Sequence, residues 1–419
     1  IPLPPGFTLS LSSGLAPLPD GSGVLVGARE GTLLCGAADQ SLSVFRADLS
    51  VAPPPGNDGT NLPHIIHSPL GDRTLFIVRL SSGGRELWTT DGTPAGTQRL
   101  GAGGIATLGA TDDRYFFTWG NANSIADQVW VTDGTPAGTV RWSMMSLEAS
   151  PGGFAEIQWP YSAVAGDRLI VRPHSTRTAD QGLLDVFDSG GRMTALEPGP
   201  GVPIQQGSVA GAPVLFGGAV HLPIAEPSVG VRLGVTEGSA ATTRVAIPML
   251  FPDVGGLTGV GDLGWFTFRN ASQRTEVWRT DGTEAGTFQT GTTSASASIP
   301  GPFIAGGDGV LVSSMGLQTS DGSPASLRRL AAAATNGVPG VDGAGRIYHA
   351  VRAGSVLNVS RVDPVSGAAT LLASPSSNDQ DPVLRPAAGG MYFTLYASGG
   401  WYLWRSGGSP ESTLAVLGA

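Results

Sequence analysis

The sequence contains no lysine: all 24 basic residues are arginine, against 33 acidic residues, and the net charge is −9. Nonspecific nucleic-acid binding needs a basic face, so this balance argues against nucleic acid as a partner. The single cysteine, Cys35, cannot form a disulfide within the chain, and its apolar surroundings in TLLCG indicate a buried thiol rather than a nucleophile. No run of eighteen apolar residues is present, so we predict no membrane span.

The motifs of several common catalytic sites are also missing. The sequence has no G-x-S-x-G elbow, no H-E-x-x-H helix, no P-loop and no G-x-G-x-x-G dinucleotide fingerprint. Only five histidines occur, and the H-x-x-H spacing of His64 and His67 would place their side chains on opposite faces of a strand. We therefore predict neither a metal site nor a cofactor.

The chain is rich in turn-forming residues, with 63 glycines and 32 prolines among its 419 residues. Its apolar residues come in short bursts such as TLFIVRL, RYFFTW and MYFTLY, and no long segment has a helical period. Short apolar bursts bounded by glycine and proline are typical of strands. The sequence therefore predicts an all-β protein.

One twelve-residue motif recurs with few changes. It reads ELWTTDGTPAGT at 86–97, QVWVTDGTPAGT at 128–139 and EVWRTDGTEAGT at 276–287. Six weaker copies can be aligned on its acidic residue. The position of the motif tryptophan is then Phe45, Trp88, Trp130, Asp185, Gly234, Trp278, Gln318, Ser360 and Trp404, with spacings of 40 to 55 residues.

A period near 45 residues with four strand-like bursts per unit is the signature of a β-propeller. In the second unit the four strands would be HIIHSPL, TLFIVRL, ELWTT and TQRLG. We predict a single propeller domain over residues 1–419 with nine four-stranded blades. Eight blades are the alternative, because the first unit is the least regular.

The repeated motif is interpreted as structural. Its aspartate can accept hydrogen bonds from backbone N–H groups ahead of it, and its glycine supplies a positive φ, so the motif would close the hairpin between the third and fourth strands. The tryptophan would fill the space between blades. Calcium binding is the alternative, although one aspartate per turn is a poor site. The residues assigned to the structural role are Trp88, Asp91, Gly92, Trp130, Asp133, Gly134, Trp278, Asp281 and Gly282.

The three strong copies resemble the ELWxxDGTxxGT repeat family of bacterial propeller-like proteins. The resemblance implies a propeller fold and an exported protein of the periplasm, cell surface or exterior, and it brings no catalytic residues. The first residues, IPLPPG, lack a methionine, as expected of a trimmed export precursor or of a truncated chain.

Function is expected on the face opposite the motif hairpins, where irregular loops open. The loops of units three to six are the longest, at 120–127, 174–182, 221–230 and 269–275, and a long connection precedes unit four. Aromatic, arginine, asparagine and acidic side chains there would suit a glycan or peptide surface. The candidate ligand-binding residues are Trp159, Tyr161, His174, Arg177, Asp180, His221, Glu226, Asn270 and Arg274.

Three hypotheses follow from this reading of the loops. The preferred one is a monomeric, non-catalytic binding or scaffold propeller that holds a glycan or a protein on the long-loop face. The alternative is a carbohydrate-active hydrolase or lyase with its site near the ring axis. The third is a structural spacer without a ligand.

Overall fold

The computed structural model describes residues 16–17, 23–29, 32–37, 42–46, 64–79, 85–91, 96–111, 113–120, 129–143, 162–171, 184–188, 192–196, 213–226, 230–239, 241–251, 254–293, 303–306, 309–313, 316–331, 336–376, 382–387, 389–397 and 400–417. Over these residues, 36 strands form nine four-stranded sheets, and each sheet is built from consecutive strands of the chain.

The first three sheets consist of β1 (Ala16–Pro17), β2 (Gly23–Arg29), β3 (Thr32–Ala37) and β4 (Leu42–Arg46); β5 (His64–Leu70), β6 (Arg73–Arg79), β7 (Arg85–Thr90) and β8 (Gln98–Ala102); and β9 (Gly104–Ala110), β10 (Tyr115–Gly120), β11 (Val129–Thr132) and β12 (Val140–Ser143). The next three consist of β13 (Ser162–Ala165), β14 (Arg168–Val171), β15 (Leu184–Phe187) and β16 (Met193–Leu196); β17 (Val214–Phe216), β18 (Ala219–Glu226), β19 (Gly230–Thr236) and β20 (Arg244–Phe251); and β21 (Gly255–Val260), β22 (Leu263–Arg269), β23 (Thr275–Thr280) and β24 (Phe288–Thr292).

The last three consist of β25 (Ile304–Gly306), β26 (Gly309–Ser313), β27 (Leu317–Ser320) and β28 (Arg328–Arg329); β29 (Gly340–Val341), β30 (Ile347–Ala353), β31 (Val356–Val362) and β32 (Ala369–Ala373); and β33 (Leu384–Ala387), β34 (Gly390–Ala397), β35 (Gly400–Ser406) and β36 (Thr413–Leu417), with the short 3-10 helix η1 (Pro410–Ser412) before β36. All neighbouring strands pair antiparallel, as expected of sheets joined by short turns.

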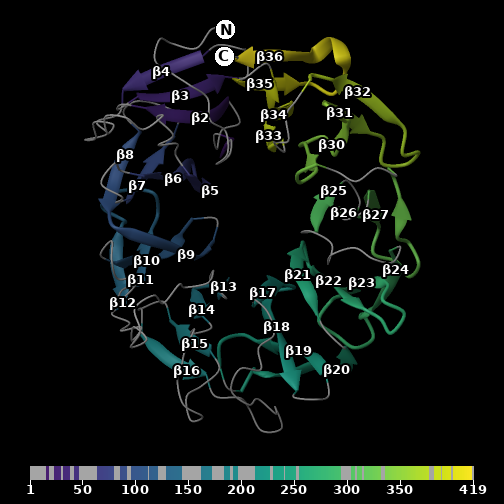
Figure 1. Cartoon of the computed structure of the whole chain (residues 1–419). Coiled ribbons are helices and arrows are strands. Elements are labelled where there is room, and N and C mark those ends of the chain that lie inside the picture. The colour runs from purple at the N-terminus through teal and green to yellow at the C-terminus, as the bar shows by residue number, and fades with distance from the viewer. Residues whose placement is uncertain are drawn as a thin grey trace.

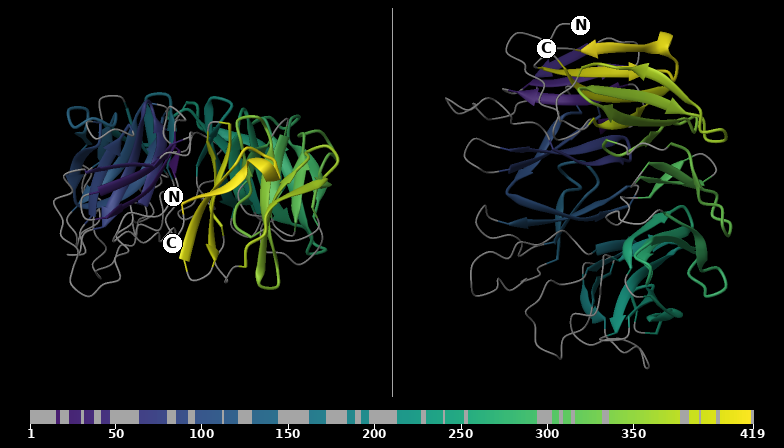
Figure 2. Two further views of the ribbon diagram at one scale, coloured as in Figure 1. Left: turned by 90° about the horizontal axis from the view of Figure 1, so that it is seen from above. Right: turned by 45° about the vertical axis from the view of Figure 1, so that its right-hand side comes forward.

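The sheets stand around a common axis, and the predicted all-β propeller is confirmed (Figure 1). The first strand of each sheet lies nearest to the axis and the fourth strand lies at the outside. The ring closes where β1 contacts β33, so the first and last sheets meet without exchanging a strand. Seen from above, the sheets form a disc (Figure 2).

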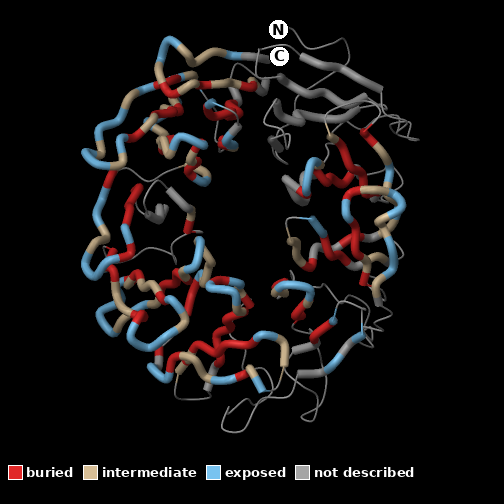
Figure 3. Tube along the Cα trace, turned by 180° about the vertical axis from the view of Figure 1, so that it is seen from behind, coloured by how far each residue is buried: buried red, intermediate tan, exposed pale blue. Residues whose placement is uncertain are grey.

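The hydrophobic core lies between neighbouring sheets, and buried segments recur in the part of the ring whose burial is described (Figure 3). Leu233 and Phe251 of the fifth sheet pack in one cluster with Phe266 and Trp278 of the sixth. Trp130 of the third sheet packs in the same way against residues of the second. A four-stranded sheet has two apolar faces, of which one is covered by the preceding sheet in the ring and the other by the following sheet.

The motif lies on the third strand in eight of the nine sheets, from Trp88 on β7 to Trp404 on β35. The first sheet differs, because Phe45 lies on its fourth strand, β4, opposite Leu33 of β3. The first segment, on which the eight-blade alternative depended, forms the complete sheet β1–β4.

One predicted loop is a strand instead. The segment 221–230 was expected to form a long loop of the fifth unit, but β18 runs to Glu226 and pairs with β19, which begins at Gly230. Side chains on both faces of this segment are buried, including His221, Leu222 and Ile224, and this burial holds the segment in the sheet. The connection between the strands is therefore only 227–229.

Candidate functional site

The sequence-based candidate residues do not come together as one described site. Trp159, Tyr161, His174, Arg177 and Asp180 lie outside the described residues. Glu226 is the last residue of β18. The three remaining candidates, His221, Asn270 and Arg274, lie in two different environments.

His221 is a core residue and not a loop residue, which corrects the sequence analysis. Its side chain is 3% exposed and stacks on Phe216, with the ring centroids 3.7 Å apart. Its Nδ1 lies 3.2 Å from the carbonyl oxygen of Ala219. Burial lowers the pKa of His221 to about 4, so the ring is neutral at neutral pH. A neutral, stacked imidazole in this place supports packing rather than ligand binding.

Asn270 and Arg274 bound the tight turn between β22 and β23. The Asn270 side-chain oxygen accepts hydrogen bonds from the backbone N–H groups of Ser272 (3.0 Å) and Arg274 (3.1 Å). The Asn270 Nδ2 donates to Glu276 Oε1 over 2.8 Å. Asn270 is thus occupied in shaping its own turn, while the Arg274 side chain is exposed.

A local network of hydrogen bonds holds the motif hairpin. In the third sheet, the backbone N–H and the hydroxyl of Thr135 both donate to Asp133 Oδ1, over 2.8 and 2.7 Å. The hydroxyls of Thr132 and Thr139 lie 2.7 Å apart across the hairpin, and the Gly138 N–H donates to Thr135 Oγ1 over 2.9 Å. The sixth sheet repeats these contacts around Asp281.

Both glycines of the motif are required by this geometry. Gly282 has a φ of +89°, a conformation that disfavours other residues. The second glycine, Gly286, lies against the aspartate, because a Cβ there would be 2.1 Å from the Asp281 carboxyl group. Since Asp281 bonds the turn, the carboxylates of these hairpins serve the fold. The Thr283 hydroxyl also holds the pKa of Asp281 below its usual value.

A glutamate two residues before the tryptophan is a further part of the motif that sequence reasoning missed. Trp88 Nε1 donates to Glu86 Oε2 over 3.1 Å, and Trp278 Nε1 donates to Glu276 Oε2 over 3.0 Å. In the ninth sheet Tyr402 stands at the glutamate position, and Trp404 Nε1 is buried with no partner among the described residues. The E-x-W spacing was the available signal, because i and i+2 share one face of a strand.

Arginines join successive sheets by binding the motif turn of the next one. Arg168 Nη1 of the fourth sheet donates to the carbonyl oxygen of Glu237 in the fifth, over 2.8 Å. Arg328 of the seventh sheet donates to the carbonyl oxygens of Pro364 and Val365 in the eighth. Each contact satisfies turn carbonyls that the sheet leaves unpaired.

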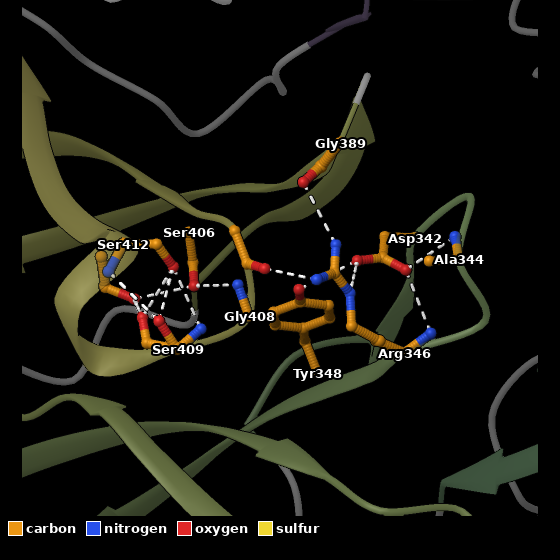
Figure 4. A network of polar contacts seen from close by, with 11 residues as sticks. Asp342, Ala344, Arg346, Tyr348, Gly389, Ser406, Gly408, Ser409 and Ser412 are labelled. Atoms are coloured by element: carbon orange, nitrogen blue, oxygen red, sulfur yellow. Dashed lines mark hydrogen bonds and ion pairs between the residues drawn. The ribbon is translucent and has the colours of Figure 1, made fainter.

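A network of several such hydrogen bonds around Arg346 joins the eighth and ninth sheets (Figure 4). Arg346 Nε lies 2.6 Å from the buried Asp342 Oδ2, and its Nη1 and Nη2 donate to the carbonyl oxygens of Gly407 and Gly389. Tyr348 Oη donates to Asp342 Oδ2 over 2.9 Å. Burial and the Asp342 carboxylate raise the pKa of Tyr348, so this phenol is not a general base at neutral pH. An aspartate, an arginine and a tyrosine meet here to join two sheets.

The axis-side strands carry almost no ionisable residues. The nine first strands contain no aspartate, glutamate or tyrosine, and their only ionisable residues are His64, His67 and Arg385. Glycoside hydrolysis commonly needs a pair of carboxylates, and these strands supply none. Among the side chains of these strands that the structure describes, Leu215 on β17 is a large apolar one left exposed, at 44%.

No group of three or more histidine, cysteine, aspartate or glutamate residues suited to a metal ion occurs among the described residues. Within the same part of the chain, no helix has both the length and the apolar character needed to cross a membrane.

No family model and no curated protein matches the sequence. Among solved structures, the chain is similar to puromycin hydrolase (14% identity, TM-score 0.44), with 80% of this chain and 57% of that chain covered. It is also similar to a prolyl endopeptidase (11% identity, TM-score 0.43), with 74% of this chain and 49% of that chain covered. A third similar structure is the β-propeller domain of the Trilobed protease from Pyrococcus furiosus (12% identity, TM-score 0.41), with 73% of this chain and 93% of that chain covered. The chain thus spans about half the length of the first two. At this identity the likeness carries neither substrate nor catalytic residues to this chain.

The expectation of a non-catalytic binding or scaffold propeller that holds its partner on the long-loop face is corrected by the structure. Segment 221–226 is a strand and not a loop, and the candidate ligand residue His221 is buried in the core. Asn270, a second candidate, bonds within its own turn.

Proposed function

We propose that the chain is the propeller of a hydrolase that acts on peptides, and that its axis-side strands contact the substrate. The observation that supports this is the composition of the nine first strands, which lack carboxylates and consist mainly of small and apolar residues. Such strands offer apolar contact and backbone hydrogen-bonding groups, which suit an extended, uncharged peptide better than a sugar chain.

The reacting groups of such a hydrolase are expected outside the described strands. The buried carboxylate Asp342 is taken up by Arg346 and Tyr348, and Asp133 and Asp281 bond the motif turns. A peptide is the first substrate to test, because the similar solved structures include a prolyl endopeptidase and the β-propeller domain of a protease. We further propose an exported protein, on the resemblance of its three strong motif copies to an exported repeat family.

The test is a binding and cleavage assay with Leu215 as the probe. Labelled neutral peptides, acidic peptides and polysaccharides are incubated with the protein, and binding is followed by fluorescence anisotropy and products by mass spectrometry. Leu215→Asp places a charge on an axis-side strand, so we expect it to weaken neutral-peptide binding about tenfold, or ~1.4 kcal/mol.

Val365→Asp is the matched control, because Val365 is 80% exposed in the motif turn of the eighth sheet, away from the axis. This variant should bind as the wild type does. Equal effects of the two substitutions, or cleavage of polysaccharides without peptide binding, would rule out the proposed function.

A further inference from the structure

The position beside the motif tryptophan is aromatic in four sheets and polar in the eighth. In four sheets the second strand places a phenylalanine opposite the tryptophan, and these pairs are Phe76–Trp88, Phe117–Trp130, Phe266–Trp278 and Phe393–Trp404. In the eighth sheet the corresponding pair is His349 of β30 and Ser360 of β31.

His349 is buried at the interface between the seventh and eighth sheets. Its side chain is 4% exposed, and Ile347, two residues earlier on the same face of β30, packs against Leu317 and Leu330 of the seventh sheet. His349 Nδ1 has no hydrogen-bond partner within the described residues. A buried ring nitrogen of this kind is tolerated only while the ring is uncharged, because a buried charge needs a partner.

No carboxylate is available to a protonated His349 from the described faces around it. On its own sheet Ile347, Ser360 and Val362 share its face. On the seventh sheet β25 and β26 contain no ionisable residue, and β27 and β28 contain only two arginines. One of them, Arg328, extends to the turn of the eighth sheet and has the same sign as a protonated histidine. Asp308, between β25 and β26, lies outside the described residues.

We propose that the interface between the seventh and eighth sheets is an acid-sensitive joint of the ring, which loosens when His349 takes up a proton. When the sheets separate, water reaches the imidazole and solvates the added charge, which the closed interface cannot do. Because each sheet is covered only by its neighbours, loosening one interface leaves the other sheets folded.

The direction of the pH dependence follows from burial. Burial lowers the pKa of His349 below its usual value of 6.5. The open form therefore binds more protons than the closed form, so the closed interface is fully stable above that value and loses stability as the pH falls through it. For one proton, the equilibrium constant for opening rises about tenfold per pH unit below pH 6.5, where the open form is protonated and the closed form is still neutral.

Hydrogen–deuterium exchange of the whole protein at about pH 7.5 and about pH 5.5 tests this joint, after correction for the intrinsic exchange rate at each pH. In the wild type we expect acid to increase opening at β26–β27 and β30–β31 about tenfold in total between these two pH values, because the open form gains its proton only near and below pH 6.5. Peptides of β34 and β35, at the interface where Phe393 and Trp404 pack, serve as the internal control and should not change.

Two variants separate protonation of His349 from a general effect of acid. His349→Leu keeps an apolar side chain of similar reach, and its exchange at the joint should not respond to pH. Ser360→Asp places a carboxylate opposite His349 and should reverse the response, so that the joint is better protected at the lower pH. The proposal would be overturned if exchange at the joint in His349→Leu still increased in acid, or if acid increased exchange equally at all interfaces of the wild type. It would also be overturned if Ser360→Asp did not reverse the response.

Discussion

The contact between Glu86 and Trp88 gives a sharp test of how the motif holds the sheets together. Glu86 is 2% exposed, and it accepts the Trp88 indole N–H over 3.1 Å. Arg99 Nη2 lies 2.9 Å from its other oxygen. The substitution Glu86→Leu would leave the indole N–H buried in an apolar environment without an acceptor.

The expected loss can be worked from these two contacts. An unsatisfied buried N–H group costs about 1–3 kcal/mol. The ion pair with Arg99 adds little, ~0–1 kcal/mol, because the Arg99 side chain is 43% exposed and its charge is screened by solvent. We therefore expect Glu86→Leu to lower the free energy of unfolding by about 2 kcal/mol. Glu86→Gln keeps an acceptor and should cost less than about 1 kcal/mol.

A double-mutant cycle with Trp88→Phe isolates the hydrogen bond, because phenylalanine keeps an aromatic ring but has no N–H group. Urea denaturation followed by circular dichroism gives the unfolding free energies of the single and double variants. The coupling between Glu86 and Trp88 should be about 1–2 kcal/mol. A coupling near zero, or equal losses for Glu86→Leu and Glu86→Gln, would refute the assigned role of the glutamate.

Three further predictions concern the motif and the buried histidine. Gly286→Ala should lower the free energy of unfolding by about 3 kcal/mol, because its Cβ would meet the Asp281 carboxyl group at 2.1 Å. Adding Asp281→Ala to the same chain should recover part of the thermal stability, and no recovery would contradict the clash. Trp278→Ala should lower the free energy of unfolding by about 3–5 kcal/mol by opening the interface with the fifth sheet, and a near-neutral denaturation curve would exclude this packing role. Stability conferred by neutral His221, whose pKa is lowered to about 4, is complete above pH 6.5 and decreases as the pH falls toward 4; melting temperatures of His221→Phe should lack this component, and a pH profile identical to that of the wild type would refute it.

The fold was predictable from the sequence because its determinants are local. Hydrogen bonds within eight residues, such as Asp133 to Thr135 and Thr132 to Thr139, close each hairpin, so each motif copy marks one hairpin. The motif of the first sheet was assigned to the wrong strand, because Phe45 lies on the fourth strand and this copy of the motif is the weakest. Segment 221–230 was misread because Pro223 and Gly230 favour a loop, whereas pairing between β18 and β19 makes it a strand.

The candidate site was far less predictable. Polar residues such as His221 and Asn270 read as ligand-binding groups in isolation, but the structure gives them partners in the core and in a turn. The Glu86–Trp88 contact lies within one strand and its spacing could have revealed it, whereas the contact of Arg346 with Gly407 spans 61 positions of the chain. Nothing in the spacing of such residues indicates that they meet.

The sequence by itself therefore determined the all-β class, the repeated unit and the chemistry of each hairpin, because these depend on side-chain periodicity and on hydrogen bonds between near neighbours. Tertiary structure alone decided which side chains face each other across sheets, including Arg168 on the turn of Glu237 and Ile347 against Leu317 of the seventh sheet. It also decided that the strands next to the axis present hardly any charge. The physical reason is that the stability of a propeller lies between its sheets, where residues distant in the chain exclude water together.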